Sequence, residues 1–347
     1  MSYLGHFMAL LDRFSRPLRS LRLSVTDRCN LRCQYCMPEQ DYVWLPRESL
    51  LTFEEIGAIV DAFTALGVDR VRITGGEPLL RRDLPVLIES LAGRSAIADL
   101  ALTTNGVLLR PQVRALRAAG LHRITVSLDT LDSSRFRALT RTDDLDRVLD
   151  GIEAAAEAGF AALKLDTVVI RGVNDAEMVP LLEYAKRVRA ELRFIEYMDV
   201  GGATHWTRDA VVSRSEMIAR LRTHYGGVLP LDESSSAPAD RFLLPDGTTF
   251  GIISSTTEPF CASCDRSRLT ADGVWLLCLY AATGTDLRRP LRAGTTRDDL
   301  QRLIEAVWSV RADRGAEERL GMDRETTLVP LRSLKKDAHL EMHTRGG

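Results

Sequence analysis

The sequence predicts an α/β protein built on an incomplete (β/α)6 barrel, followed by a C-terminal α+β extension. Between residues 20 and 200, short runs rich in β-branched residues alternate with amphipathic segments of helical period. Repeated strand–helix–strand units of this kind form parallel sheets with right-handed crossovers. After residue 200 the alternation gives way to hairpin signals. We therefore expect a barrel domain in residues 1–200 and a second domain in residues 201–347.

The expected strands are separated by helices with recognisable end signals. Thr52 and Glu55 have the spacing of a capping box, and Pro111 is expected to open the next helix. Asn174 is expected to cap a third helix, with Glu177 completing the cap. This order fits an open sheet or an incomplete barrel like that of triosephosphate isomerase. The expected strands are residues 21–26, 71–74, 100–104, 124–128, 163–170 and 192–198.

Polar and glycine-rich signals follow the ends of these strands. Residues 75–78 read Gly-Gly-Glu-Pro, residues 105–106 read Asn-Gly, and Asp129 and Asp199 end two further strands. One such segment is explained equally well by an ordinary turn between a strand and a helix. Because parallel barrels build active sites at the carboxyl ends of their strands, the whole set predicts an active site there.

All six cysteines fall in two groups of three, at Cys29, Cys33 and Cys36 and at Cys261, Cys264 and Cys278. Iron–sulfur clusters use cysteine thiolates, and three ligands on a four-iron cluster leave one iron open to a reactive ligand. Zinc is the alternative, but it takes four ligands, and few histidines lie near either group. Disulfides are disfavoured because residues 1–20 do not make a signal peptide, so we expect a cytoplasmic protein.

The second cysteine group lies around two expected hairpins. Residues 241–244 and 248–253 flank one turn, and residues 268–270 and 274–280 flank another. Pairing across the second turn sets Cys278 opposite Arg266 or Ser267, close to the other two cysteines of its group. Arg266 and Arg268 alternate by two, so we expect both to project beside the cluster.

Composition excludes several functions. A net charge of −2 gives no basic field for nucleic acid, and no apolar run approaches the roughly 18 residues of a membrane span. No lysine follows a glycine-rich loop, so no P-loop is present. An anionic ligand must therefore be held by individual cations, which in this chain are mostly arginines.

The motif Cys29-x-x-x-Cys33-x-x-Cys36, with Tyr35 before its last cysteine, resembles the signature of the radical S-adenosylmethionine (SAM) superfamily. Residues 21–30, 72–78, 103–106 and 260–268, with the terminal Gly-Gly, narrow the resemblance to the GTP 3′,8-cyclase family. That resemblance runs from about residue 12 to the end of the chain. It implies the first enzyme of molybdenum cofactor biosynthesis.

The resemblance also implies the cofactors and the reaction. Two [4Fe-4S] clusters and SAM are expected, the first cluster binding SAM and yielding a 5′-deoxyadenosyl radical, the second presenting an open iron to guanine. The radical takes the ribose 3′ hydrogen, and ring closure at C8 gives (8S)-3′,8-cyclo-7,8-dihydroguanosine 5′-triphosphate. Residues carried over to the SAM site are Tyr35, Gly76, Ser127 and Met198.

Further residues are expected at the GTP site. The substrate-binding set is Arg22, Arg72, Thr103, Lys164, Arg193, Arg266, Ser267 and Arg268, and the catalytic set is Arg22, Arg266, Arg268, Gly346 and Gly347. Taken alone, Arg193 is better explained by a salt bridge with a barrel carboxylate. The expected partners are an electron donor such as a flavodoxin or ferredoxin, and cyclic pyranopterin monophosphate synthase, which receives the product. No nucleic acid or membrane partner is expected, and the chain is expected to be a monomer or homodimer.

Two alternatives remain at this stage. One is another radical SAM enzyme, such as a peptide-modifying maturase, although those families carry more cysteines downstream than the three that follow Cys36. The other is a non-enzymatic iron–sulfur carrier or zinc-stabilised module, which needs neither six βα units nor a ring of cations.

Overall fold

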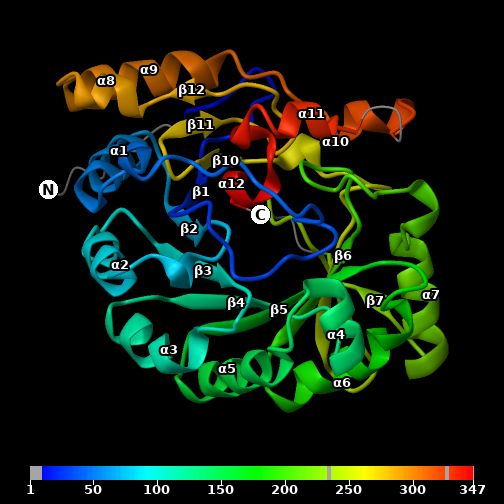
Figure 1. Ribbon diagram of the computed structural model, residues 1–347. Helices are drawn as coiled ribbons and strands as arrows, with labels where there is room; N and C mark the ends of the chain where they lie inside the picture. The colour runs from blue at the N-terminus through cyan, green and yellow to red at the C-terminus, as the bar shows by residue number, and fades with distance from the viewer. Residues whose placement is uncertain (1–9, 233–235, 325–327, 347) are drawn as a thin grey trace, which may run out of the picture.

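The computed structural model describes residues 10–232, 236–324 and 328–346. One curved sheet of 12 strands runs through this part of the chain, in the order β12-β11-β10-β1-β2-β3-β4-β5-β6-β9-β8-β7 (Figure 1). The barrel strands are β1 (Ser20–Ser24), β2 (Arg70–Thr74), β3 (Asp99–Thr104), β4 (Arg123–Ser127), β5 (Ala162–Val169) and β6 (Glu191–Glu196). The others are β7 (Leu229–Pro230), β8 (Asp240–Leu243), β9 (Thr249–Ile253), β10 (Arg266–Leu269), β11 (Val274–Leu276) and β12 (Thr285–Asp286).

The C-terminal part extends the barrel at both edges. Strand β10 pairs in parallel with β1, and β9 pairs in parallel with β6. In the first of these pairs Ser20 lies opposite Arg266, and Arg22 lies opposite Arg268. The two hairpins β8–β9 and β10–β11 are antiparallel, as predicted. The barrel and its extension therefore share one continuous sheet.

The helices cover the outside of the sheet, whereas α12 lies in the middle of the ring of strands (Figure 1). Those between the barrel strands are α1 (Phe53–Ala65), α2 (Leu84–Ala92), α3 (Leu109–Ala118), α4 (Ser133–Thr140), α5 (Leu145–Glu157) and α6 (Met178–Arg187). Later in the chain come α7 (Arg214–Tyr225), α8 (Arg288–Arg292), α9 (Arg297–Ser309), α10 (Gly315–Glu318), α11 (Leu331–Leu334) and α12 (Met342–Arg345). No helix in the described part combines the length and apolar character that a membrane crossing requires.

Along the barrel strands, apolar side chains that face the core alternate with polar side chains that face the lumen. Val71 and Ile73 on β2 are fully buried in the apolar core, while Arg72 between them lines the lumen. Leu21 and Leu23 on β1 repeat this arrangement on either side of Arg22. Because side chains alternate along a strand, the apolar set fixes which polar residues face inward.

The end signals of the helices were predicted with mixed success. Thr52 and Glu55 form the predicted capping box. The prediction for Pro111 is wrong by two residues, because α3 begins at Leu109. Proline is tolerated there since the first-turn N–H groups of a helix have no partner within it.

The predicted cap at Asn174 is wrong. Its side-chain oxygen accepts from the Ile170 N–H, and its amide donates to the carbonyls of Asp129 and Val168. Glu177 instead accepts from Thr130 Oγ1 and from the Leu131 N–H. Both side chains therefore bind neighbouring loops, and α6 begins after a short 3-10 turn, at Met178.

Candidate active site inside the barrel

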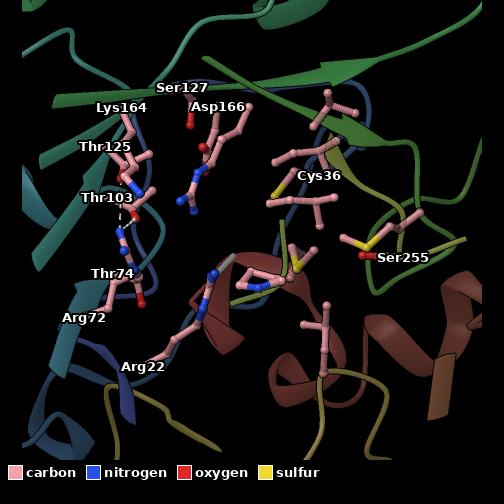
Figure 2. A pocket seen from close by; sticks show the side chains of 18 of the residues that line it. Arg22, Cys36, Arg72, Thr74, Thr103, Thr125, Ser127, Lys164, Asp166 and Ser255 are labelled. Atoms are coloured by element: carbon pink, nitrogen blue, oxygen red, sulfur yellow. Dashed lines mark hydrogen bonds between the residues drawn. The ribbon is translucent and has the colours of Figure 1, made fainter. Parts of the chain in front are cut away.

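A cavity of about 650 Å³ fills the barrel lumen and opens at its mouth. Its lining includes all three cysteines of the first group and, from the second region, Phe260, Arg266 and Arg268. Figure 2 shows Arg72, Thr103, Thr125 and Lys164 reaching in from one side, with Cys36 across the cavity. The cavity therefore joins the two cysteine regions of the chain.

The first cysteine group occupies the loop after β1. The Cys33 carbonyl accepts from the Cys36 N–H at 3.0 Å and from the Met37 N–H at 2.7 Å, which folds the loop into a tight turn. Burial and the neighbouring Glu77 raise the pKa of Cys29 to about 11, and burial also raises the pKa of Cys33 and Cys36. Such thiols ionise at neutral pH only with a strong positive partner, and a metal cluster provides one.

No three Cys, His, Asp or Glu side chains of the described residues stand close enough to share a single metal ion. In an iron–sulfur cubane each cysteine binds a different iron, so its ligands stand further apart than those of one zinc ion. All three thiols nevertheless line one cavity, and burial, followed by the charge on Cys29, raises the pKa of Cys33 and Cys36. This donor set fits a cluster.

The loop after β2 packs against the first cysteine loop through its backbone. Gly76 donates its N–H to the Thr26 carbonyl at 2.8 Å, and a Cβ at Gly76 would collide with the Arg28 carbonyl. Glu77 accepts from Leu79, Thr104 and Asn105, while burial raises its pKa to about 7. The Gly-Gly-Glu-Pro segment therefore braces the cysteine loop.

The other residues carried over for SAM also line the cavity. Ser127 and Met198 line it, as does Tyr35, whose hydroxyl donates to Asp129 Oδ2 at 2.7 Å. Burial raises the pKa of Asp129 to about 6, and its Oδ1 accepts from the Val168 N–H. Asp129 was expected only as a strand-end signal, and the structure makes it the partner of Tyr35.

Cations crowd the lumen. Arg72 Nη1 donates to Thr103 Oγ1 and to Thr125 Oγ1, both at 3.1 Å. Burial lowers the pKa of Arg72 to about 10 and that of Lys164 to about 8. Burial, followed by the charges of Arg268 and Arg72, lowers the pKa of Arg22 well below its usual value. The lumen therefore favours an anionic ligand.

Two carboxylates in the lumen were missed from the sequence. Glu191 bonds to Arg193 at 3.0 Å, to Arg241 at 3.1 Å and to Lys164 at 3.4 Å, so the salt bridge considered for Arg193 is present. Asp166, two residues beyond Lys164 on β5, also lines the cavity. Glu191 lies two residues before Arg193, and Asp166 lies two residues after Lys164. Because side chains two apart on a strand share a face, this spacing could have identified both carboxylates.

The second cysteine group lies at the start of β10 and beyond the end of β11. Cys278 lies two residues after Leu276, which pairs with Arg268 at the end of β11, so the predicted pairing of Cys278 with Arg266 lies beyond the paired part of the hairpin. Arg266 Nη2 donates to Cys264 Sγ at 3.4 Å. Burial raises the pKa of Cys278 to about 11; burial also acts on Cys264, but Arg266 and Arg311 lower its pKa to about 7. Ser267 alternates with the two arginines, is buried, and is not part of the cavity lining.

The C-terminal segment enters the mouth of the barrel. Arg268 Nη1 donates to the Gly346 carbonyl at 2.6 Å and to the Arg345 carbonyl at 3.2 Å. Gly346 has a φ of +73°, and a Cβ there would collide with Thr74 Oγ1. Gly347 lies outside the described residues. The predicted insertion of the tail is confirmed as far as Gly346.

Two family models match this chain, one over the barrel region and one over the C-terminal region. Residues 23–185 match the model of the Radical SAM superfamily, and residues 190–317 match Molybdenum Cofactor Synthesis C. The chain is 57% identical over 340 residues to GTP 3′,8-cyclase 1 of Mycobacterium tuberculosis (strain ATCC 25618 / H37Rv), covering 97% of this chain and 95% of that protein. It is 48% identical to GTP 3′,8-cyclase of Acidothermus cellulolyticus, covering 89% of this chain and 88% of the relative.

A solved structure shares the fold. Streptococcus suis SuiB aligns with a TM-score of 0.59 and 16% sequence identity, covering 84% of this chain and 68% of that chain. At this identity the likeness concerns the fold alone, and it confirms the predicted partial barrel with an extension.

Proposed function

Since this chain belongs to the GTP 3′,8-cyclase family of radical SAM enzymes, we propose that its two cysteine groups divide the reaction between them. The reaction converts GTP to (8S)-3′,8-cyclo-7,8-dihydroguanosine 5′-triphosphate, the first step of molybdenum cofactor biosynthesis. In this proposal the first group forms the radical-generating half of the site and the second group holds the substrate. The cation-lined cavity between them carries the proposal.

In the first half, Cys29, Cys33 and Cys36 would hold the [4Fe-4S] cluster of a radical SAM enzyme. When bound, this cluster and SAM supply the one-electron chemistry that removes a hydrogen atom from the substrate. Tyr35 keeps the loop in place through its bond to Asp129, and Gly76 permits the close backbone packing behind it. With Ser127 and Met198 these residues form the proposed SAM site.

In the second half, Cys261, Cys264 and Cys278 would hold a second [4Fe-4S] cluster with one iron open to guanine. Arg22, Arg72 and Lys164 would bind the triphosphate, because burial among like charges leaves them favouring an anionic partner. Guanidinium groups suit this role since they bind phosphate oxygens in pairs. Arg193 takes part through the network around Glu191. Thr103, through its bond with Arg72, completes the proposed set at the cavity, whereas Ser267 is buried outside the cavity lining and is not assigned a contact with GTP.

The tail completes the site from the mouth. Arg268 would keep Gly346 over the substrate through the Gly346 carbonyl, and Gly346 and Gly347 would act in conversion of GTP more than in its binding. Together with Arg22 and Arg266 these residues form the proposed catalytic set.

The proposal extends to partners. An electron donor such as a flavodoxin or ferredoxin would reduce the first cluster, and cyclic pyranopterin monophosphate synthase would take the product. We expect the protein to act as a monomer or homodimer.

An anaerobic incubation with SAM, reductant and GTP tests the function, with products identified by mass spectrometry. Formation of the cyclic triphosphate with 5′-deoxyadenosine supports it, and 5′-deoxyadenosine without cyclised nucleotide contradicts it. Iron and acid-labile sulfide in the reconstituted protein test the second cluster separately. About eight irons per chain supports two cubanes, whereas about four leaves only one.

A further inference from the structure

We propose that Arg311 is a positioning residue for the second cluster, which holds the Cys264 loop and directs an N–H group at the Cys264 sulfur. Acting through that sulfur, Arg311 raises the reduction potential of a cluster bound there. This inference rests on the proposed second cluster and adds a residue that the sequence motifs did not indicate.

Arg311 is held in one orientation just after α9. It is buried, at 3% exposure, and its guanidinium lies 4.5 Å from the Trp308 ring centroid. Its Nε donates to Asp313 Oδ2 at 2.9 Å, and its Nη1 donates to the Cys264 carbonyl at 3.0 Å. Its Nη2 donates one N–H to Asp313 Oδ1 at 3.2 Å, and the same nitrogen lies 3.8 Å from Cys264 Sγ, within range of an N–H···S hydrogen bond from its second N–H.

Cys264 is thereby approached by two guanidinium groups. Arg266 Nη2 lies 3.4 Å from the same sulfur and stacks its guanidinium over Phe260. Hydrogen bonds to the sulfurs are among the factors that set iron–sulfur potentials. Reduction adds negative charge to a cluster, so donors that stabilise this charge make the cluster easier to reduce.

Arg311 and Arg266 differ in what else they touch. Arg266 lines the cavity, so substrate can reach it. Arg311 is packed behind the cysteine loop, where Asp12 Oδ2 lies 3.7 Å from its Nη1. Its effect on the cluster is therefore independent of substrate binding.

Arg16 provides a matched control. It is also buried, at 2% exposure, and belongs to the same network through Asp12 at 2.6 Å. Its Nη1 donates to the Cys261 carbonyl at 3.0 Å and to the Asp313 carbonyl at 2.9 Å. It thus holds the same loop by a carbonyl, and its hydrogen bonds go to oxygen atoms.

The test is a redox titration of the reconstituted holoenzyme followed by electron paramagnetic resonance. The signal of the second cluster is identified as the one retained in Cys33→Ser. Arg311→Gln should shift that potential to a more negative value with the iron content unchanged, and Arg16→Gln should leave it in place. An unchanged potential in Arg311→Gln, or equal shifts in both variants, overturns the proposal.

A second measurement applies if Arg311→Gln loses its cluster. In protein labelled with ¹⁵N-arginine and carrying Arg266→Lys, pulsed resonance on the reduced second cluster should still detect coupling to an arginine nitrogen. Absence of that coupling overturns the proposal. Four irons per wild-type chain would instead refute the second cluster itself, and this inference with it.

Discussion

Replacing Gly346 by alanine should separate the role of the tail from that of the rest of the cavity. The residue has a φ of +73°, and its carbonyl accepts a 2.6 Å bond from Arg268. An L-residue in the left-handed region costs about 1–2 kcal/mol. The added methyl group would also meet Thr74 Oγ1 and approach Ser24 Cβ to 3.4 Å.

This strain is relieved if the tail leaves the cavity, so it acts on docking rather than on global stability. A cost of about 1–2 kcal/mol lowers the ratio of docked to undocked tail by roughly 5- to 30-fold, and the collision with Thr74 lowers it further. We therefore expect Gly346→Ala to lose cyclised product in proportion to the fall in the docked fraction, which approaches this factor once the undocked tail predominates. Both clusters, SAM cleavage and the affinity for GTP should remain largely intact, as they should after deletion of Gly346 and Gly347.

Gly172 supplies the control because it has nearly the same φ, +72°, with nothing within 4 Å of an added Cβ. Gly172→Ala carries the same backbone strain in the turn between β5 and α6, outside the cavity lining, so it should lower the unfolding free energy and leave product formation unchanged. The assay is quantification of cyclic triphosphate and 5′-deoxyadenosine by mass spectrometry. Full-rate product from Gly346→Ala, or an equal loss in Gly172→Ala, would refute the reasoning.

Three further predictions follow from the cysteines, the cavity cations and His339. Cys33→Ser should abolish 5′-deoxyadenosine formation, whereas Cys264→Ser should keep uncoupled SAM cleavage without cyclic product; identical behaviour of the two variants would contradict the proposed division. Arg268→Ala should weaken GTP binding, measured calorimetrically, by about 1.5–3 kcal/mol or roughly one to two decades, and unchanged affinity with intact clusters would indicate a structural role. The hydrogen bond to Asp272, outweighing burial, raises the pKa of His339 above its usual 6.5. Its stabilising effect is complete below about pH 6.5 and is lost as pH rises through the folded-state pKa, so urea midpoints should fall as pH rises above about 6.5, and less steeply in His339→Gln.

Local sequence patterns predicted the barrel because apolar and polar residues alternate within each strand. Val71 and Ile73 alternate with Arg72, so one short segment reveals both the strand and the face that looks inward. The cysteine motif likewise specifies its chemistry within eight positions, from Cys29 to Cys36.

Contacts between distant segments could not be predicted in this way. Asn174 and Glu177 have the spacing of a cap, but loops elsewhere in the fold take both side chains. Arg311 stands 47 residues from the cysteine it contacts, with no motif around it. Glu191 acquires its three cations only when β5, β6 and β8 come together.

In the proposed division of the reaction, the register of β10 against β1 fixes the distance between the two halves of the site. Cys264 precedes the position where Arg266 meets Ser20, and Cys29 follows the opposite end of β1. Five residues of strand at about 3.3 Å each separate the two loops by roughly 17 Å. A substrate that is bound near one cysteine group and reacts near the other must span that length. The strand pairing would therefore select substrates by their length as well as by their charge. A slip of one residue in the register of β10 against β1 would change this distance by about 3.3 Å and would turn Arg266 and Arg268 out of the lumen.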